Sequence, residues 1–451
     1  MNILLVRPNT PKDSINLQSF MICEPLELEY VASALLNENH HVDLVDMLLE
    51  KKSLNYFLKQ KEYDMVCFTA YITTVGMVKN YARIVKKYNP NIKTVVGGVH
   101  AEVVPTDFVD ENIDYILWAN GVMTLLELVK NYPNIKKNQI LGLYRGEGSI
   151  KPAIINGNLL KPNREITAKY RNNYNYIFHN NCATIKTSYG CPFKCSFCFC
   201  TQVCDYSVRR LEDVLDELES IKEDNVFIVD DDFLVSKERI KAFCDGLDRR
   251  NIKKHYIAFG RADFIAVNEE VMIMLKEHGF DAFFVGIESF KKEELNSFSK
   301  KTSVEINIAA VDVLERNGIQ CYSGLIVGED WVKDDFDTLI NYLNSFKYPM
   351  VNIQPITPMP GTPLFENYKY EIKEKRDNYA HWDMAHIVYE PLKMSKRKYY
   401  YHIVRAYLKT VASKKMRKYI KERYGISIYR RVRSGATKIF FQYLKLMLFP
   451  N

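Results

Sequence analysis

The sequence has no long apolar run. None of its stretches reaches the roughly 18 consecutive apolar residues of a membrane-spanning helix, so we expect no membrane span. The first residues, MNILLVRPNT, lack the basic leader and the cleavage site of a secretory signal. Ten cysteines in 451 residues are too few for a disulfide scaffold of this size. Together these absences predict a cytoplasmic protein whose thiols stay reduced.

Charge is also unevenly distributed. The chain carries 26% charged residues, as folded globular proteins do, and a net charge of +7. Beyond Lys393 lysine and arginine are frequent, and Glu422 is the only acidic residue. This basic, tyrosine-rich region is typical either of a solvated helical cap or of a surface that attracts anionic lipid or an anionic substrate. We expect no nucleic-acid partner.

Residues 1–140 alternate short apolar runs with helix-period segments. The predicted strands are 2–6, 41–45, 65–69, 93–96 and 115–118. Such repeats indicate a doubly wound, Rossmann-like parallel sheet, which binds ligands at the carboxyl ends of its strands. The polar or flexible residues that follow these strands are Asn9, Thr69, Tyr71, Thr73, Gly97, Gly98 and His100.

A second alternating region covers residues 183–365. It holds six strand–helix units, too few for a closed eightfold barrel, so we predict a partial (β/α)6 barrel whose site lies at the strand ends. Residues 141–182 lack a clear period and contain Pro152 and Pro162, which favours a linker or cap. Residues 366–451 are predicted to form a basic helical region.

Five of the ten cysteines are clustered after the first strand of the second region. Three of them form the pattern Cys191-x3-Cys195-x2-Cys198. Four-iron clusters are usually held by four cysteines, so three thiolates would leave one iron with an open coordination position. A zinc site extended by Cys200 and Cys204 is the alternative, although zinc motifs usually pair two C-x2-4-C units or add histidines.

The segment TSYGCPFKCSFCFC resembles the radical S-adenosylmethionine (SAM) superfamily, whose signature is CxxxCxxC after the first barrel strand. The resemblance implies a [4Fe–4S] cluster and reductive cleavage of SAM to methionine and a 5′-deoxyadenosyl radical. It also implies an electron donor of the flavodoxin or ferredoxin type.

The resemblance assigns further residues to SAM. Phe197 matches the aromatic residue that flanks the adenine, and Glu288 looks like the ribose contact, because a carboxylate can accept both hydroxyl hydrogens. The segment Gly324-Leu-Ile-Val-Gly328, with Ile326 at its centre, resembles the GxIxG motif that packs against the adenine.

Acidic residues follow the second strand of this region, in the run Asp230-Asp231-Asp232. The family often has Gly-Gly-Glu here, binding the SAM amino group, so Asp230 is implied to bind SAM; a solvated acidic turn is the alternative. Arg261 ends the third strand, and we predict either a contact to the SAM carboxylate or a structural ion pair.

The N-terminal region is similar to the cobalamin (B12)-binding domain that is fused to radical SAM enzymes. It lacks the acidic residues of a phosphoacceptor receiver and the glycine-rich turn of a dinucleotide-binding domain. The resemblance implies that Gly97 and Gly98 let the backbone approach cobalamin, while Thr69, Tyr71, Thr73 and His100 hydrogen-bond along it. Asn9 is also assigned to this cofactor. Two departures are the missing Asp-x-His-x-x-Gly and the run Ala119-Asn120-Gly121-Val122 where acidic residues are usual. A degenerate domain kept for substrate binding or assembly is the alternative.

With both cofactors, the implied reaction is methylation of an unactivated carbon in a small-molecule or lipid substrate. Asp231, Asp232 and Tyr189 are expected at the rim, where they could act on protons. Two alternatives are a cobalamin-linked rearrangement, cyclisation or ring contraction, and a non-enzymatic protein that senses cobalamin or SAM. The basic C-terminal region also suggests peripheral contact with a membrane.

Overall fold

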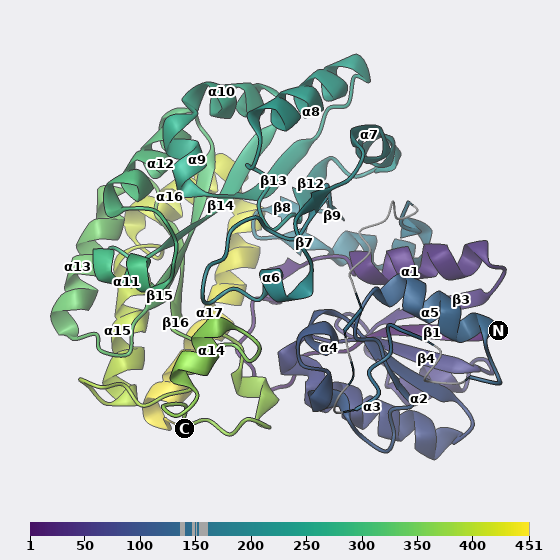
Figure 1. Cartoon of the computed structure of the whole chain (residues 1–451). Helices are drawn as coiled ribbons and strands as arrows, with labels where there is room; N and C mark the ends of the chain where they lie inside the picture. Colours follow the sequence, from purple (N-terminus) through teal and green to yellow (C-terminus); the bar gives the residue numbers. More distant parts are fainter. Residues whose placement is uncertain (136–139, 147–148, 150, 153–160, 451) are drawn as a thin grey trace.

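The computed structural model describes residues 1–135, 140–146, 149, 151–152 and 161–450. The predicted linker, 141–182, is therefore described only in part. Figure 1 shows an N-terminal α/β unit beside a larger unit that curves around a second sheet, with the last helices behind that sheet.

The N-terminal unit is a five-stranded parallel sheet with the order β3-β1-β4-β5-β6. Its strands are β1 (Asn2–Arg7), β3 (His41–Asp46), β4 (Met65–Thr69), β5 (Lys93–Gly97) and β6 (Tyr115–Ile116). Its helices are α1 (Leu26–Asn37), α2 (Leu54–Leu58), α3 (Val75–Tyr88), α4 (Val99–Val103) and α5 (Gly121–Lys130), with 3-10 turns η1 (Ile72–Thr74) and η2 (Pro105–Phe108). This order confirms the predicted doubly wound sheet.

The apolar run of β1 explains the two layers of helices. Ile3 and Leu5 belong to a core with α1 and α5, whereas Leu4 and Val6 belong to a core with α2 and α3. All four side chains are completely buried. A strand that is covered on both faces must be apolar on both faces, which is the pattern of a parallel sheet.

The second unit contains a six-stranded parallel sheet in the order β9-β12-β13-β14-β15-β16. Its strands are β9 (Cys182–Ile185), β12 (Asn225–Ile228), β13 (His255–Gly260), β14 (Phe280–Glu288), β15 (Gln320–Val327) and β16 (Met350–Pro355). Its helices are α6 (Cys200–Val203), α7 (Leu211–Ser220), α8 (Lys237–Arg249), α9 (Ala262–Val267), α10 (Glu269–Glu277), α11 (Lys292–Ser297), α12 (Val304–Arg316), α13 (Lys333–Ser345) and α14 (Pro363–Tyr368). Strands β9 and β16 are the two edges, so the predicted open barrel is confirmed.

Several short β-strands and their pairings were not predicted from the sequence. β2 (Met21–Ile22), β7 (Asn175–Tyr176) and β8 (His179–Asn180) form a small antiparallel sheet, and η4 (Arg164–Asn173) precedes it. β10 (Ser188–Tyr189) pairs with β11 (Ser207–Val208), so the cysteine loop is closed at its base. Strands of two residues are too short to show a hydrophobic period.

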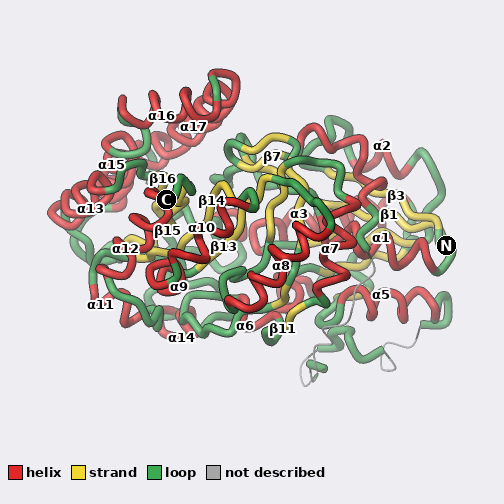
Figure 2. The backbone as a smooth tube through the Cα atoms, turned by 90° about the horizontal axis from the view of Figure 1, so that it is seen from above, coloured by secondary structure: helices red, strands yellow, loops and turns green. Residues whose placement is uncertain are grey.

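The C-terminal region becomes continuously helical later than its composition suggests. Between α14 and Lys396 the regular structure is the short turn η5 (Tyr379–His381), after which come α15 (Lys396–Lys409), α16 (Lys414–Tyr424) and α17 (Ile426–Leu448). Figure 2 shows these three helices gathered at one end of the molecule. Over the described residues, every helix is too short or too polar to cross a membrane.

Candidate active site

A cavity of about 590 Å³ lies between the two units. The N-terminal sheet contributes the ends of β4, β5 and β6, together with α1 and α5; the second unit contributes the ends of β9 and β12, Tyr189 and the cysteine loop. Its polar lining residues include Glu24, Glu27, Tyr30, Thr69, Tyr71, Glu102, Asn120, Thr184, Lys186, Tyr189 and Asp231. The carboxyl ends of strands from both sheets therefore open on one space, as expected for ligand sites in such folds.

The turn after β5 shapes the floor of this cavity. Gly98 has φ of +99°, and a Cβ built on it would lie 2.7 Å from the backbone nitrogen of Ala70. A Cβ on Gly97 would lie 3.2 Å from Leu117. The two glycines let the ends of neighbouring strands close together beneath the cavity.

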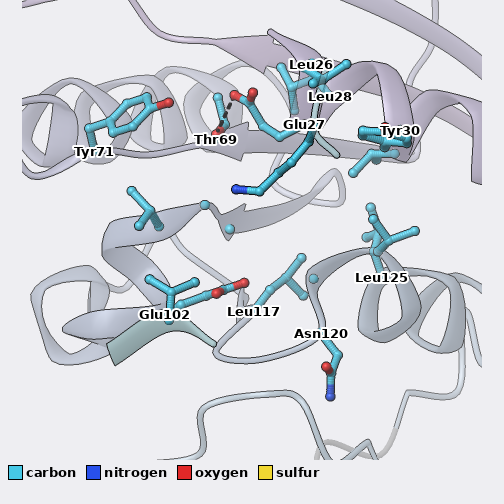
Figure 3. Close-up of a pocket in the computed structure, with 18 of the residues that line it drawn as sticks. Leu26, Glu27, Leu28, Tyr30, Thr69, Tyr71, Glu102, Leu117, Asn120 and Leu125 are labelled. Atoms are coloured by element: carbon cyan, nitrogen blue, oxygen red, sulfur yellow. Dashed lines mark hydrogen bonds between the residues drawn. The ribbon is translucent and has the colours of Figure 1, made fainter. Parts of the chain in front are cut away.

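The walls combine apolar side chains with carboxylates that the sequence did not single out, Glu27 and Glu102 among them. Figure 3 shows Glu27 beside Thr69 on one wall and Glu102, with Leu117 and Asn120, on the other. Thr69 donates a hydrogen bond of 3.2 Å to Glu27. Burial raises the pKa of Glu27, and it raises the pKa of Glu102 to about 7 despite two nearby lysines. Glu27 could have been suspected because it lies in the first turn of α1, beside the strand ends.

Three of the residues predicted to contact cobalamin do not line the cavity. Asn9 accepts a hydrogen bond of 2.8 Å from the Tyr81 hydroxyl, and Thr73 lies in η1 outside the lining. His100 is buried, with Nε2 2.7 Å from Asp107. Because Gly98 caps α4, the His100 side chain turns away toward η2. Thr69, Tyr71, Gly97 and Gly98 do line it.

The cysteine loop runs between β10 and β11. Cys191, Cys195 and Cys198 are half-buried in it, and all ten cysteines of the chain are free thiols. In the part of the chain that the structure describes, no three His, Cys, Asp or Glu side chains converge as a formed metal site. Cys200 and Cys204 differ from the three motif cysteines because both line the cavity.

The surroundings of the loop act unequally on the three thiols. Burial raises the pKa of Cys191 to about 11, and it raises that of Cys195 although Lys300 and Arg261 oppose the rise. A hydrogen bond from Cys200 lowers the pKa of Cys198. Three soft sulfur ligands within one short loop, with cations beside them, fit an iron–sulfur cluster.

A second group of predicted residues meets beside this loop. Glu288, at the end of β14, has φ of 60°, and its Oε1 lies 2.9 Å from Nζ of Lys300. Arg261 donates to the Lys300 carbonyl at 2.8 Å and to Asp263. Its guanidinium carbon stacks 3.8 Å from the centre of the Phe193 ring. Lys300 was not predicted, because a lysine in the segment SFSKKTS carries no distinctive signal.

The three consecutive aspartates point in different directions. Asp230 is buried and accepts hydrogen bonds from the Thr187 backbone at 2.6 Å and the Ser188 hydroxyl at 2.8 Å. Asp231 accepts from the Cys200 thiol at 3.2 Å and lines the cavity. Asp232 accepts from the Leu234 backbone, but its buried Oδ2 has no partner among the described residues. Burial raises the pKa of Asp232 to about 7.

The glycines of GLIVG have unequal surroundings. A Cβ on Gly324 would meet nothing within 4 Å, whereas one on Gly328 would lie 3.0 Å from Trp331. Ile326 between them is almost completely buried. Gly324 therefore borders open space where a flat ring can approach, and Gly328 is a packing glycine. Phe197 lies edge-on to Phe298, with ring centres 5.7 Å apart.

Comparisons with known proteins identify two domains in this chain. Residues 15–129 match the B12 binding domain, and residues 185–343 match the Radical SAM superfamily. Hopanoid C-3 methylase of Methylococcus capsulatus is 30% identical over 400 residues, covering 86% of this chain and 76% of that protein. An uncharacterized methyltransferase of Pyrococcus horikoshii is 27% identical, covering 98% of this chain and 99% of that protein.

A solved structure has the same arrangement of elements. The cobalamin-dependent SAM radical enzyme OxsB, with aqua-cobalamin and SAM bound, matches with a TM-score of 0.73 at 16% identity, covering 99% of this chain and 72% of that chain. This likeness in fold extends over both sheets. The chain belongs to the cobalamin-binding radical SAM enzymes, whose cofactors are a [4Fe–4S] cluster, SAM and cobalamin.

Proposed function

We propose that this enzyme methylates an unactivated carbon of a small-molecule or lipid substrate. The observation that carries the proposal is the shared cavity: the strand ends of the B12-binding unit and the cysteine loop of the radical SAM unit line one space. When bound, the cluster and SAM supply a 5′-deoxyadenosyl radical, and cobalamin supplies the methyl group. A substrate in this cavity would lie between the two sources.

Each cofactor has its own set of residues in this proposal. Cys191, Cys195 and Cys198 hold the cluster. Thr69, Tyr71, Gly97 and Gly98 hold cobalamin, because they line the cavity on its N-terminal side. The apolar slot between α1 and α5, lined by Leu28, Leu117 and Leu125, excludes water from the buried part of that cofactor.

Phe197, Glu288, Gly324 and Ile326 form the SAM site. We assign the SAM amino group to Asp232 rather than Asp230, because the buried Oδ2 of Asp232 still needs a donor. Both oxygens of Asp230 already accept hydrogen bonds from Thr187 or Ser188. Arg261 acts as a positioning residue in this scheme, since its guanidinium is held by Asp263 and the Lys300 carbonyl.

Tyr189 and Asp231 are the proposed substrate-facing groups. Both line the cavity, and the Tyr189 hydroxyl is buried with no hydrogen-bond partner among the described residues. A polar group of the substrate would satisfy this hydroxyl, which otherwise carries the cost of an unpaired buried donor. Asp231 can accept a proton beside Cys200, with which it is hydrogen-bonded.

The proposal extends to the electron donor, the compartment and the membrane contact of the enzyme. We propose that a donor of the flavodoxin or ferredoxin type reduces the cluster, and that the enzyme works in the cytoplasm, where cysteines without disulfides are usual. We propose peripheral membrane contact through the basic C-terminal region, which also suits a lipid substrate. Nucleic acid is not expected as a substrate.

The test is anaerobic purification with cobalamin supplied, followed by addition of SAM labelled in its methyl group. We expect an absorption spectrum of both cofactors, release of 5′-deoxyadenosine and label on cobalamin. Release of 5′-deoxyadenosine without label on cobalamin would favour rearrangement, cyclisation or ring contraction. No release from a fully reconstituted sample would leave only a sensing role.

A further inference from the structure

The C-terminal helices carry the positive charge of the chain. Residues 393–451 contain 17 lysines and arginines and one acidic residue, Glu422, so they carry +16 while the rest carries −9. The net value of +7 hides this separation. A strongly basic segment on an acidic body is attracted to anionic surfaces through one part of the protein only.

One face of α17 is fixed to the protein body. Tyr443 and Leu446 are buried in the core of the second unit. Arg431 donates a hydrogen bond of 2.6 Å to the Ile177 carbonyl, and Gln442 donates one of 3.3 Å to the Ser14 carbonyl. Gly435 lies so close to Phe20 that a Cβ would come within 2.5 Å of its ring. The helix is thus held in one orientation, and the residues on its other face have a defined position.

That other face mixes cations with large apolar side chains. Arg430, Lys438, Phe441, Lys445 and Leu448 are exposed and follow one another at intervals of three, four or eight residues, which places them on one side of the helix. Phe441 is 61% exposed and Leu448 is 52% exposed.

The apolar character continues past the end of the helix, where Phe449 is 71% exposed. Apolar side chains clustered in this way, rather than scattered singly, mark an interaction surface. We call Arg430, Lys438, Phe441, Lys445, Leu448 and Phe449 the α17 outer face.

The neighbouring helix adds charge without adding apolar surface. In α16, which packs against α17, the exposed cations are Lys414, Lys415, Arg417, Lys418, Lys421 and Arg423. Glu422 is the acidic residue among them, and it pairs with Lys418 at 3.8 Å. Figure 2 shows the two helices side by side at the end of the molecule, away from the N-terminal sheet.

We propose that the α17 outer face docks on the surface of an anionic lipid bilayer. Its phenylalanines and Leu448 enter the boundary between headgroups and acyl chains, while Lys438, Lys445 and the lysines of α16 lie at the lipid phosphates. A span is excluded for this helix, which carries five cations in 23 residues. A nucleic-acid partner would use the cations but would leave the exposed apolar end of the helix in water, so the lipid surface accounts for both features.

Vesicle co-sedimentation of the full chain tests this surface. Vesicles of phosphatidylcholine are compared with vesicles in which phosphatidylglycerol replaces part of it. We expect preferential binding to the anionic vesicles, weakened by salt. The double variant Lys438→Gln/Lys445→Gln should lose affinity by about fivefold for each lysine. The double variant Phe441→Ser/Phe449→Ser should lose about tenfold for each phenylalanine.

Matched controls lie on the N-terminal unit. Lys87→Gln removes an exposed lysine, and Tyr56→Ser removes an aromatic side chain that is 45% exposed; both should bind as the unchanged protein does. Absent binding, or equal binding by all variants, overturns the proposal. The proposal is also overturned if the protein binds duplex RNA or DNA in a way that depends on the lysines but not on the phenylalanines. It is overturned too if the protein forms a dimer that the phenylalanine substitutions dissociate. Docking needs neither cofactor, so its failure would leave the proposed methyl transfer untouched.

Discussion

Lys300 and Glu288 form an ion pair inside the protein, with Nζ 2.9 Å from Oε1 and both residues less than a tenth exposed. Burial alone would lower the pKa of Lys300, but the charge and hydrogen bond of Glu288 outweigh it and raise that pKa. The lysine thereby holds the Glu288 side chain in place beside the cysteine loop, where the carboxylate is proposed to accept the ribose hydroxyls of SAM.

Replacement of Lys300 by methionine should therefore destabilise the protein strongly. It leaves a buried carboxylate unpaired, which costs about 3–5 kcal/mol. The double variant Lys300→Met/Glu288→Gln should recover much of that loss, because neither charge remains. Chemical denaturation of the single and double variants measures both values. Additive losses in the double variant would show that the two side chains do not depend on each other.

Substitution of Gly98 by alanine should impair cobalamin binding. The positive φ disfavours alanine by about 1–2 kcal/mol, and its Cβ would also press on Ala70 at 2.7 Å. We expect affinity to fall by at least about tenfold, measured by absorption titration with cobalamin. Gly146→Ala is the matched control, since Gly146 has φ of +106° and open space around a Cβ. Equal affinity in the two variants would remove Gly98 from the cobalamin site.

The sheets and the cysteine loop were predictable because buried strands need continuous apolar runs and a cluster needs closely spaced thiols. Side-chain direction in loops was not predictable in this way. Asp230, Asp231 and Asp232 are consecutive, yet strict alternation ends beyond β12 and the three side chains have different surroundings. The first accepts from the Thr187 backbone, the second faces the cavity, and the third has one buried oxygen, Oδ2, without a partner among the described residues. His100 was misplaced because the helix that starts at Val99 turns it toward Asp107.

Long-range ion pairs could not be predicted from the sequence either. Arg164 and Arg171 come from the stretch expected to be a linker, and both bind the buried Glu24 that precedes α1. Arg164 also donates to the Thr184 carbonyl and to Glu217, each at 2.7 Å. The stretch therefore joins the two units through ion pairs. Both arginines lie more than 100 residues from Glu24, and no local sequence pattern predicts an ion pair over such a distance.

Glu29, beside these pairs, should make stability depend on pH. Its side chain is fully buried, and burial raises its pKa to about 7 although Arg164 opposes the rise. The folded state therefore holds a proton that the unfolded chain releases near its ordinary pKa of 4.5. Between these values the stabilising contribution of protonated Glu29 is lost as pH rises, by at most about 3 kcal/mol.

Glu29→Gln keeps the shape and removes the titration. The stability of this variant relative to the unchanged protein should increase from pH 5 to pH 8, as measured by urea denaturation at each pH. Because both proteins share every other titrating group, the difference isolates Glu29. A difference that stays constant with pH would mean that Glu29 is charged throughout, with Arg164 dominating burial.

The division of the five clustered cysteines gives the sharpest test of the metal site. Cys191→Ser, Cys195→Ser and Cys198→Ser should each reduce bound iron and sulfide to background, since each removes a ligand from a site that has no spare protein ligand.

Cys204→Ser is the matched control: it lies in the same segment but lines the cavity, so its iron content and the absorption of the reduced and oxidised cluster should be unchanged. Cys200→Ser should keep the iron but alter the surroundings of Asp231, which the Cys200 thiol contacts at 3.2 Å. The opposite outcome is that Cys200→Ser and Cys204→Ser lose metal as completely as the other three variants, and that the unchanged protein contains zinc rather than iron. The loop would then be a zinc site without an open coordination position for SAM.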